Sequence, residues 1–481
     1  MNITPFSSIK EIRHLLDSKQ LSARELLDFT LKRFEAFDQG LGSALELFDV
    51  ESILKASQDA GPLAGIPGLI KDNICQKDRI TSCASKILER FSSTYDATAI
   101  ARLKNSGALL VGRANMDEFA MGSSTETSAY KKTHNPWDTS RVPGGSSGGS
   151  AVAVAAGLVP WSLGSETGGS VRQPASLCGI VGIKPTYGLV SRYGLVAYAS
   201  SLDQIGVFSR TVYDNALVLS VMAGHDVNDA SSLAIAPQNY TVDLQPILPK
   251  GLRIGVVHDA LNAPGMDAEI TAAIEQAVAQ LQTLGATIKQ VALPTLDYAA
   301  AAYFILSRAE AASNLSRFDG VRYGLRNKQA KSLVDMYSST RHDGFGAEVK
   351  ARIIVGNYVL STGHASEFYQ NAKKVQRLIR KEFIDTFKDV DVSFMPTTPP
   401  PAFKPGAYDA DKLQIDLQDY FTCSVNLAGI PALSIPCGQT KDKLPIGFQL
   451  IGPHLSESML YRVAHAYEQN TAWHILHPQG F

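Results

Sequence analysis

Cysteine is scarce in this sequence, with five residues among 481 and no C-x-x-C pair. Such a scattered, odd number predicts neither a disulfide framework nor a zinc site, and it is typical of proteins from a reducing cytosol. The positions are Cys75, Cys83, Cys178, Cys423 and Cys437. We therefore expect no metal site in this chain.

Long apolar runs are missing as well. The most apolar stretch, residues 151–163, is too short to cross a bilayer and is interrupted by Gly157 and Pro160. The first residues contain neither the basic region nor the apolar region of a secretion signal. These absences predict a cytoplasmic protein that does not enter a membrane.

Excess charge of either sign is missing. The sequence has 45 Lys and Arg residues and 46 Asp and Glu residues, which gives a formal net charge of −1. Such a chain does not attract a polyanion as a whole, so any nucleic acid must be held by a local patch or a partner. Hydrophobic residues make up 45% of the sequence, which is enough for a large core. No internal repeat or long linker divides the chain, and we predict one large domain.

The order of the predicted elements indicates an α/β protein. Residues 1–60 are predicted to be helical and to pack on the core, with Ser22 and Glu25 forming a capping box. After them, apolar runs suited to buried strands alternate with helical segments, as in the strand 252–257 and the helix 267–284. This alternation is typical of a layered α/β sheet.

The carboxy-terminal half has three further features. Residues 298–390 are predicted to be mainly helical and more polar, and residues 394–405 are predicted to form a Pro-rich connector. Strands are predicted over 432–436 and 446–451, followed by a helix that begins near Ser456.

Two Gly/Ser-rich blocks are the most unusual feature of the sequence. They are residues 142–150, Val-Pro-Gly-Gly-Ser-Ser-Gly-Gly-Ser, and residues 164–170, Gly-Ser-Glu-Thr-Gly-Gly-Ser. Apolar or β-prone segments flank both blocks, so flexible surface loops are the less favoured interpretation. Glycine inside a core lowers stability unless the backbone needs a positive φ or must approach a ligand closely. The blocks therefore indicate a binding or catalytic site.

Three kinds of site fit such loops. A phosphate-binding loop is disfavoured, because no lysine follows Gly149 and Pro143 interrupts the strand that a dinucleotide site needs. Residues 144–148 satisfy the Gly-x-Ser-x-Gly pattern of a nucleophile elbow, but residues 135–138 before them are turn-forming, and no histidine has a catalytic context. The elbow stays the second choice. The third kind of site needs no histidine.

That third site uses a lysine as the base for a serine nucleophile, either directly or through a second serine. Lys71 lies in an apolar segment, where an unpaired lysine is unusual. Burial lowers the pKa of a lysine, and a neutral amine is what a general base requires. Ser146 is placed to relay a proton, and Ser170 is the candidate nucleophile. The backbone N–H groups beside Ser170 are expected to form an oxyanion hole, contributed by Thr167, Gly168, Gly169 and Ser170.

Together these residues resemble the amidase signature family, whose hallmark is a long Gly/Ser-rich core with a lysine, a bridging serine and a nucleophilic serine. The resemblance implies that Lys71 is the base and Ser146 the bridging serine, which follows a cis peptide bond in the family. It implies that Ser170 forms the acyl-enzyme. The matching segments are residues 65–73, 107–122 and 144–210.

The resemblance also implies a fold. Members of the family have a single large α/β domain, here expected over residues 61–481, with a central mixed β-sheet covered by helices on both faces. Residues 1–60 then form the helical region that packs on this core.

Segments outside the core look like the glutaminase subunits of tRNA-dependent amidotransferases. They are residues 115–122, 316–324, 344–352 and 425–431. By this resemblance glutamine is the substrate, Arg352 binds its carboxylate, Asp419 binds its ammonium group, and Tyr303 makes a further contact. A hydrolase of fatty amides would instead need a membrane-binding amphipathic segment, which the sequence does not show.

The resemblance further implies a heterotrimer with B and C subunits as partners. The B subunit binds ATP, Mg²⁺ and mischarged Glu-tRNA(Gln), or also Asp-tRNA(Asn), and uses the ammonia to amidate the tRNA-bound amino acid. No cofactor is expected in this chain itself. Two alternatives stay open, a stand-alone amidase acting on a small amide and a scaffold without activity. The intact Lys71, Ser146 and Ser170 argue against the scaffold.

Overall fold

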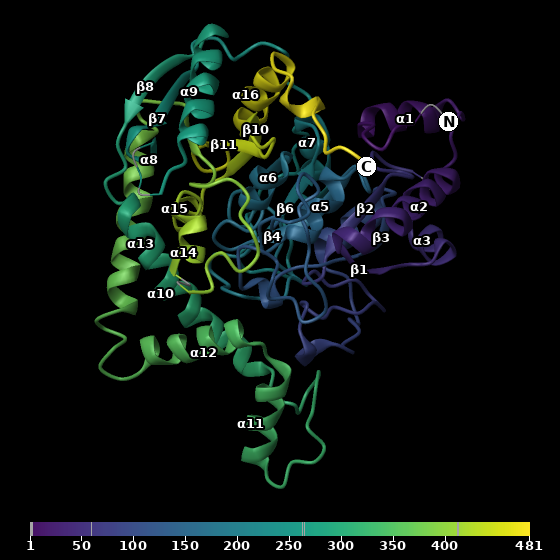
Figure 1. The fold of residues 1–481 in the computed structure, drawn as a ribbon, viewed down its shortest axis with the longest axis vertical. Helices are drawn as coiled ribbons and strands as arrows, with labels where there is room; N and C mark the ends of the chain where they lie inside the picture. Colours follow the sequence, from purple (N-terminus) through teal and green to yellow (C-terminus); the bar gives the residue numbers. More distant parts are fainter. Residues whose placement is uncertain (1–2, 59, 262, 264, 411–412) are drawn as a thin grey trace.

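A sheet of eleven strands runs through the centre of the molecule in a computed structural model that describes residues 3–481 apart from 59, 262, 264, 411 and 412 (Figure 1). In spatial order the strands are β1 (Ala44–Leu47), β3 (Leu109–Ala114), β2 (Pro67–Lys71), β4 (Trp161–Glu166), β6 (Gln204–Ser209), β5 (Val181–Lys184), β10 (Ala432–Gln439), β11 (Pro445–Ile451), β9 (Val392–Pro396), β7 (Arg253–Val257) and β8 (Thr287–Val291).

The sheet is mixed. Strand β2 is parallel to β3 and β4, and β7 is parallel to β8 and β9, whereas the other pairs are antiparallel. The helices are α1 (Ile9–Asp17), α2 (Ala23–Leu41), α3 (Val50–Ala56), α4 (Thr98–Asn105), α5 (Gly148–Ala155), α6 (Arg172–Cys178), α7 (Val212–Met222), α8 (His258–Leu261), α9 (Ala268–Thr283), α10 (Leu296–Asn314), α11 (Leu333–Gly344), α12 (Ala347–Leu360), α13 (Tyr369–Thr386), α14 (Leu413–Asp416), α15 (Cys423–Ala428) and α16 (Glu457–Gln469). Short 3₁₀ turns are η1 (Lys86–Leu88), η2 (Glu118–Ala120), η3 (Leu315–Arg317), η4 (Leu417–Asp419) and η5 (Trp473–Ile475).

Both faces of the sheet are buried, because neighbouring residues of a strand enter different cores. Leu69 belongs to a buried cluster that includes residues of α2, α5 and α6, while Ile70 belongs to another that includes residues of α4, α7, α9 and α16. Phe208 and Val207 divide in the same way. Strands covered on both sides read as continuous apolar runs. The predicted fold class, an α/β domain with a mixed sheet between helices, is confirmed.

The N-terminal region is not helical throughout. Helix α2 begins at the predicted capping box, in which Ser22 and Glu25 bond each other's backbone N–H groups. Residues 44–47, however, form β1, which pairs antiparallel with β3. β1 is thus the edge strand beside β3, and its length of four residues fits the short edge strands with which proteins limit an exposed sheet edge.

The prediction that residues 394–405 form a Pro-rich connector is wrong for residues 394–396. These residues belong to β9, which lies between β7 and β11. Pro396 is the last residue of this strand, a position where the missing N–H does not interrupt the ladder. The proline therefore marks the end of a buried strand.

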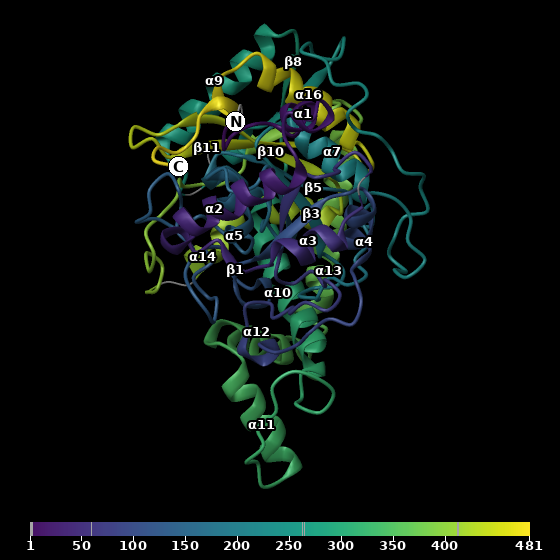
Figure 2. The same cartoon turned by 90° about the vertical axis from the view of Figure 1, so that its right-hand side faces the viewer.

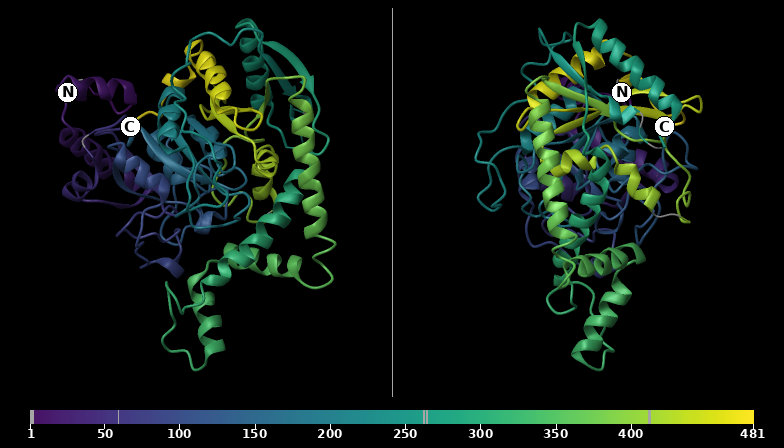
Figure 3. Two further views of the ribbon diagram at one scale, coloured as in Figure 1. Left: turned by 180° about the vertical axis from the view of Figure 1, so that it is seen from behind. Right: turned by 90° about the vertical axis from the view of Figure 1, so that its left-hand side faces the viewer.

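Helices α11 and α12 project from the rest of the chain (Figure 1), and the views from the other sides show the same projection (Figures 2 and 3). They belong to a mainly helical stretch that runs from α10 to α13. Helix α12 packs closely against α10. Among the described residues, no helix is both long and apolar enough to cross a membrane. The five cysteines are free and buried.

Candidate active site

Lys71 is the last residue of β2 and is completely buried. Because β2 lies between β3 and β4, neighbouring strands cover both of its edges. The Nζ atom lies 2.8 Å from Ser146 Oγ and 3.1 Å from the carbonyl oxygen of Ser165, and it donates to both. The structure thus brings the first two residues of the predicted relay into direct contact.

The environment changes the acidity of this amine. Burial lowers the pKa of Lys71 from 10.5 to about 7, although Asp117 and Asp203 act in the opposite direction. An amine with that pKa is neutral in a large fraction of molecules at neutral pH and can then accept a proton from Ser146.

Hydrolysis should therefore depend on pH with an ascending limb. We expect kcat/KM for an amide substrate to fall about tenfold for each pH unit below an apparent pKa near 7, because Lys71 is charged there and cannot act as a base. Steady-state rates of ammonia release between about pH 5 and 9 measure this limb. A rate that stays constant across this range would contradict the role of Lys71.

Ser146 lies in a loop held by a side chain of α6 and by a backbone N–H of residue 117. The peptide bond between Gly145 and Ser146 is cis, as the family resemblance implies. Gln173 of α6 accepts from the N–H of Gly145 at 2.9 Å, and the carbonyl oxygen of Ser146 accepts from the N–H of Asp117 at 3.1 Å. A Cβ at position 145 would overlap the carboxylate of Asp117, so only glycine permits this close approach. The hydroxyl of Ser146 is thus fixed beside Lys71.

Ser170 lies in the turn between β4 and α6 and is 4% exposed. The turn is fixed by Glu166, whose carboxylate accepts from the N–H groups of Val171 and Arg172 at 3.0 Å each and from Arg172 Nε at 2.9 Å. Burial raises the pKa of Glu166, but the charge and hydrogen bonds of Arg172, together with the charge of Lys184, outweigh it and keep the pKa below its ordinary value. In the described residues no hydrogen bond joins the hydroxyls of Ser146 and Ser170.

The rest of the predicted oxyanion loop is also anchored. Thr167 donates from Oγ1 to Asp203 Oδ1 at 2.6 Å, and Asp203 accepts in addition from the N–H groups of Tyr198 and Ala199 at 2.8 and 3.2 Å. Burial raises the pKa of Asp203 to about 6. Because these bonds fix the side chain of Thr167, the backbone from 167 to 170 keeps a defined orientation.

Two of the three predicted glutamine-binding residues lie directly against this loop. A Cβ at Gly168 would overlap the ring of Tyr303, and a Cβ at Gly169 would overlap Asp419 Oδ1. Asp419 also accepts from Ser123 Oγ at 3.1 Å. The glycines therefore let an aromatic ring and a carboxylate approach the backbone beside Ser170.

Arg352 is the third predicted glutamine-binding residue. It belongs to α12, and its charge acts on Tyr303. It donates from Nη1 to the hydroxyl of Tyr198 and from Nε to Glu348, each at 2.7 Å. Burial raises the pKa of Tyr303, the negative charge of Asp419 adds to this, and the positive charge of Arg352 opposes it. The guanidinium lines a cavity of about 330 Å³. Asp419 thus adjoins the loop of Ser170, whereas Arg352 is connected to that loop through Tyr198 and through its charge on Tyr303.

Four buried charged residues of this region were not singled out in the sequence. Glu166 and Arg172 form the pair that fixes the turn, Asp203 fixes Thr167, and Glu118 lines the cavity beside Arg352. Charged residues are rarely buried without a structural or functional role. Glu166 and Arg172 stand on either side of the Gly-Gly-Ser turn, and this charge pattern within an apolar stretch is a signal that the sequence contains.

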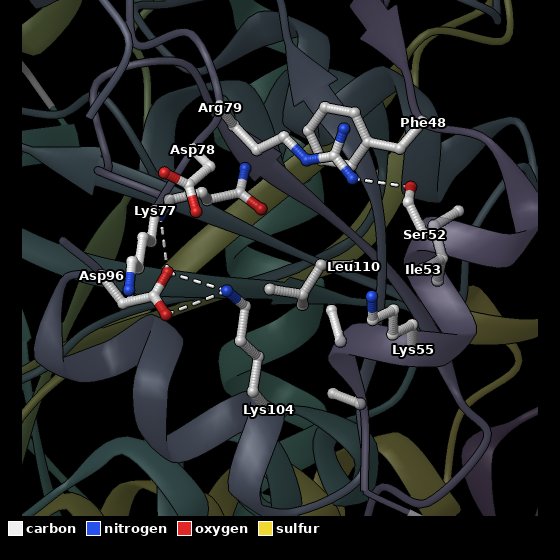
Figure 4. A pocket seen from close by; sticks show the side chains of 13 residues that line it. Phe48, Ser52, Ile53, Lys55, Lys77, Asp78, Arg79, Asp96, Lys104 and Leu110 are labelled. Atoms are coloured by element: carbon white, nitrogen blue, oxygen red, sulfur yellow. Dashed lines mark hydrogen bonds and ion pairs between the residues drawn. The ribbon is translucent and has the colours of Figure 1, made fainter. Parts of the chain in front are cut away.

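A larger hollow, of about 470 Å³, lies away from these residues (Figure 4). In it Lys104 contacts both carboxylate oxygens of Asp96, and Arg79 stacks on Phe48 while donating to Ser52. The charged groups of Lys104, Asp96 and Arg79 in this hollow therefore already have partners within the protein. The hollow contains none of the predicted site residues.

Comparison with known proteins identifies the family. The family model described as Amidase matches residues 25–461. The chain is 52% identical to the A subunit of glutamyl-tRNA(Gln) amidotransferase from Picosynechococcus sp., over 98% of this chain and 100% of that one, and 50% identical to the protein of that name from Geobacillus thermodenitrificans, over 97% and 98%. It also resembles the crystal structure of the protein of that name from Thermotoga maritima, with a TM-score of 0.83, 39% identity and coverage of 98% and 96%. The chain belongs to the amidase family.

Proposed function

We propose that this chain is the glutamine-hydrolysing subunit of a tRNA-dependent amidotransferase. The observation that carries the proposal is the arrangement around Gly168 and Gly169, where Tyr303 and Asp419 adjoin the loop of Ser170 and the charge of Arg352 acts on Tyr303. This arrangement suits a small amide with both a carboxylate and an ammonium group. The likeness to the A subunits of glutamyl-tRNA(Gln) amidotransferases, over nearly the whole length of both chains, supports the same interpretation.

The reaction begins when neutral Lys71 accepts a proton from Ser146, which takes the proton of Ser170. The Ser170 oxygen attacks the side-chain amide carbon of glutamine, and the oxyanion is stabilised by the backbone N–H groups of the 167–170 loop. The C–N bond breaks as the proton returns through Ser146 to the leaving nitrogen, which departs as ammonia. Water then attacks the glutamyl ester by the same relay and releases glutamate.

Arg352 is proposed to bind the carboxylate of glutamine. We expect Arg352→Ala to raise the KM for glutamine about 10- to 100-fold with little change in kcat, because a charge-assisted hydrogen bond to the substrate is lost in ground state and transition state alike. Initial rates over a range of glutamine concentrations measure this. Arg377→Ala, which removes an exposed arginine of α13, is the control and should leave KM unchanged. A fall in kcat with an unchanged KM would count against this assignment.

The partners proposed for this chain are B and C subunits, and the complex is proposed to act in the cytoplasm. ATP, Mg²⁺ and the mischarged Glu-tRNA(Gln), or Asp-tRNA(Asn), are assigned to the B subunit. Within the described residues, no group of three His, Cys, Asp or Glu side chains is placed to hold a metal ion.

The test compares ammonia release from glutamine by the purified chain alone and by the chain co-expressed with B and C subunits. The proposal expects strong stimulation by the partners and a further response to ATP and Glu-tRNA(Gln). Full activity of the chain alone on unrelated amides, without preference for glutamine, would instead indicate a stand-alone amidase.

A further inference from the structure

Three sequence segments outside the relay of Lys71, Ser146 and Ser170 come together beside the candidate site. They are residues 115–122, 316–324 and 344–352. Their aromatic residues form one cluster, in which the ring of Phe119 lies 5.0 Å from that of Phe318 and 5.6 Å from that of Phe345. The amidase core and the base of the projecting helices are therefore packed as one unit at this point.

Glu118 is the charged residue of this unit and is 1% exposed. Its Oε2 accepts from the N–H of Gly346 at 2.8 Å, and its Oε1 accepts from the hydroxyl of Ser85. The same hydroxyl also lies 3.2 Å from the carbonyl oxygen of Gly344. Two backbone groups at the α11–α12 junction are thus tied to the core.

Gly346 is the N-cap residue of α12 and has no side chain with which to cap it. The carboxylate of Glu118 instead accepts from the N–H of Gly346 itself, the bond that the glutamate of a capping box makes, and a Cβ at position 346 would overlap its Oε2. A negative charge at a helix N-terminus is favourable, because the first N–H groups are unpaired and the helix dipole is positive there. Burial raises the pKa of Glu118 to about 7, while the hydroxyl of Ser85, the N–H of Gly346, Lys350 and Lys86 favour its charged form.

Arg352 lies in the second turn of α12, directly after the turn that Glu118 anchors. Glu348, in the first turn, accepts from Arg352 Nε, so the orientation of this turn sets where the guanidinium points. The cavity is lined by Glu118, Gly346 and Arg352 together. A shift at the N-terminus of α12 would therefore move the guanidinium relative to Asp419 and the Ser170 loop, which belong to other elements.

We propose that Glu118 is a positioning residue that fixes the N-terminus of α12 and thereby holds Arg352 in place for the carboxylate of the substrate. This inference rests on the proposed hydrolysis of glutamine. In this inference Glu118 helps the site to bind an α-amino acid in preference to a simple amide. Cleavage of the amide bond does not depend on Glu118.

The experiment compares Glu118→Ala and Glu118→Gln in the full chain with its partner subunits at about pH 8, where the carboxylate of the wild type is charged. Substrates are glutamine and 4-aminobutanamide, which is glutamine without its carboxylate. Glu118→Ala should raise the KM for glutamine roughly tenfold with kcat within about twofold, and should leave kcat/KM for 4-aminobutanamide unchanged. Glu118→Gln keeps an acceptor for Gly346 and should recover most of the affinity.

A double-mutant cycle separates positioning through Arg352 from a general structural effect. Adding Glu118→Ala to Arg352→Ala should raise the KM no further, since coupled residues are non-additive. Glu126→Ala is the matched control, because Glu126 lines the same cavity but bonds the N–H of Gly406 instead of α12. Additive effects, an equal loss for both substrates, or the same loss in Glu126→Ala would overturn the inference. A wild type that cleaves other amides but not glutamine would overturn the proposed function instead.

Discussion

Replacing Ser170 with alanine should reduce glutamine hydrolysis by at least about 10⁴-fold, the size of loss seen when the residues of a nucleophilic relay are removed. In the proposed mechanism no ester forms without this hydroxyl, and the oxyanion loop alone gives only a small residual rate. The fold should be unaffected, because alanine fits wherever serine fits and Glu166 holds the turn through Val171 and Arg172. Ammonia release and thermal unfolding of the purified variant measure the two effects.

Ser176→Ala provides the control for this variant. Ser176 lies on α6, close after the turn, and is as deeply buried as Ser170. Removal of its hydroxyl should leave the rate within about threefold of the wild type. Glutamine hydrolysis that survives in Ser170→Ala would mean that another residue is the nucleophile.

Replacing Lys71 with methionine should remove activity and yet stabilise the fold. Without the amine, the proton of Ser146 has no acceptor, and we expect kcat to fall at least about 10³-fold. The folded pKa of about 7 lies below the ordinary value of 10.5. Keeping this lysine buried therefore costs about 4 kcal/mol at neutral pH, an upper limit, since methionine also loses two hydrogen bonds.

The direction in which the free energy of unfolding changes with pH is an independent check on the lowered pKa of Lys71. A lysine with a lowered folded pKa destabilises the protein fully below about pH 7, and this cost disappears as the pH rises toward 10.5. The free energy of unfolding of the wild type should therefore rise with pH over this window more steeply than that of Lys71→Met. Denaturant unfolding at several pH values measures both slopes.

Lys184 is the matched control. It is equally buried, its pKa is also lowered to about 7 by burial, and its Nζ donates to the carbonyl oxygen of Pro185. Lys184→Met should change the pH dependence of stability in the same way but keep activity within about threefold. If both variants lost activity alike, the effect of Lys71→Met would be structural and not catalytic.

Local signals in the sequence account for many of the elements. The predicted strand 252–257 and helix 267–284 correspond to β7 and α9 within one residue at each end. In α9 the reason is visible, because Asp267 caps the helix and accepts from the N–H of Glu269. The order of the strands has no such signal, since pairs such as β5 with β10 join residues far apart in the chain.

The residues of the candidate site differ in the same way, because some are indicated by their neighbours in the sequence and others only by the fold. Lys71, Ser146 and Ser170 stand in motifs, because each needs particular neighbours, such as glycines that let other groups approach. Glu118 lies in the matching segment 115–122, but neither its neighbours nor those of Asp203 indicate a role, because the partners Gly346 and Thr167 are brought to them only by the fold. A buried carboxylate with distant partners cannot be distinguished from a surface carboxylate by its neighbours in the sequence.

The most direct test of the proposed mechanism is to trap the covalent intermediate. The complex is mixed with glutamine, quenched in acid within the first turnovers, digested and examined by mass spectrometry. The proposal predicts a glutamyl ester on the peptide that contains Ser170, and its absence in Ser170→Ala. A glutamyl adduct on Ser146 or on a cysteine, with Ser170 unmodified during full turnover, would contradict it.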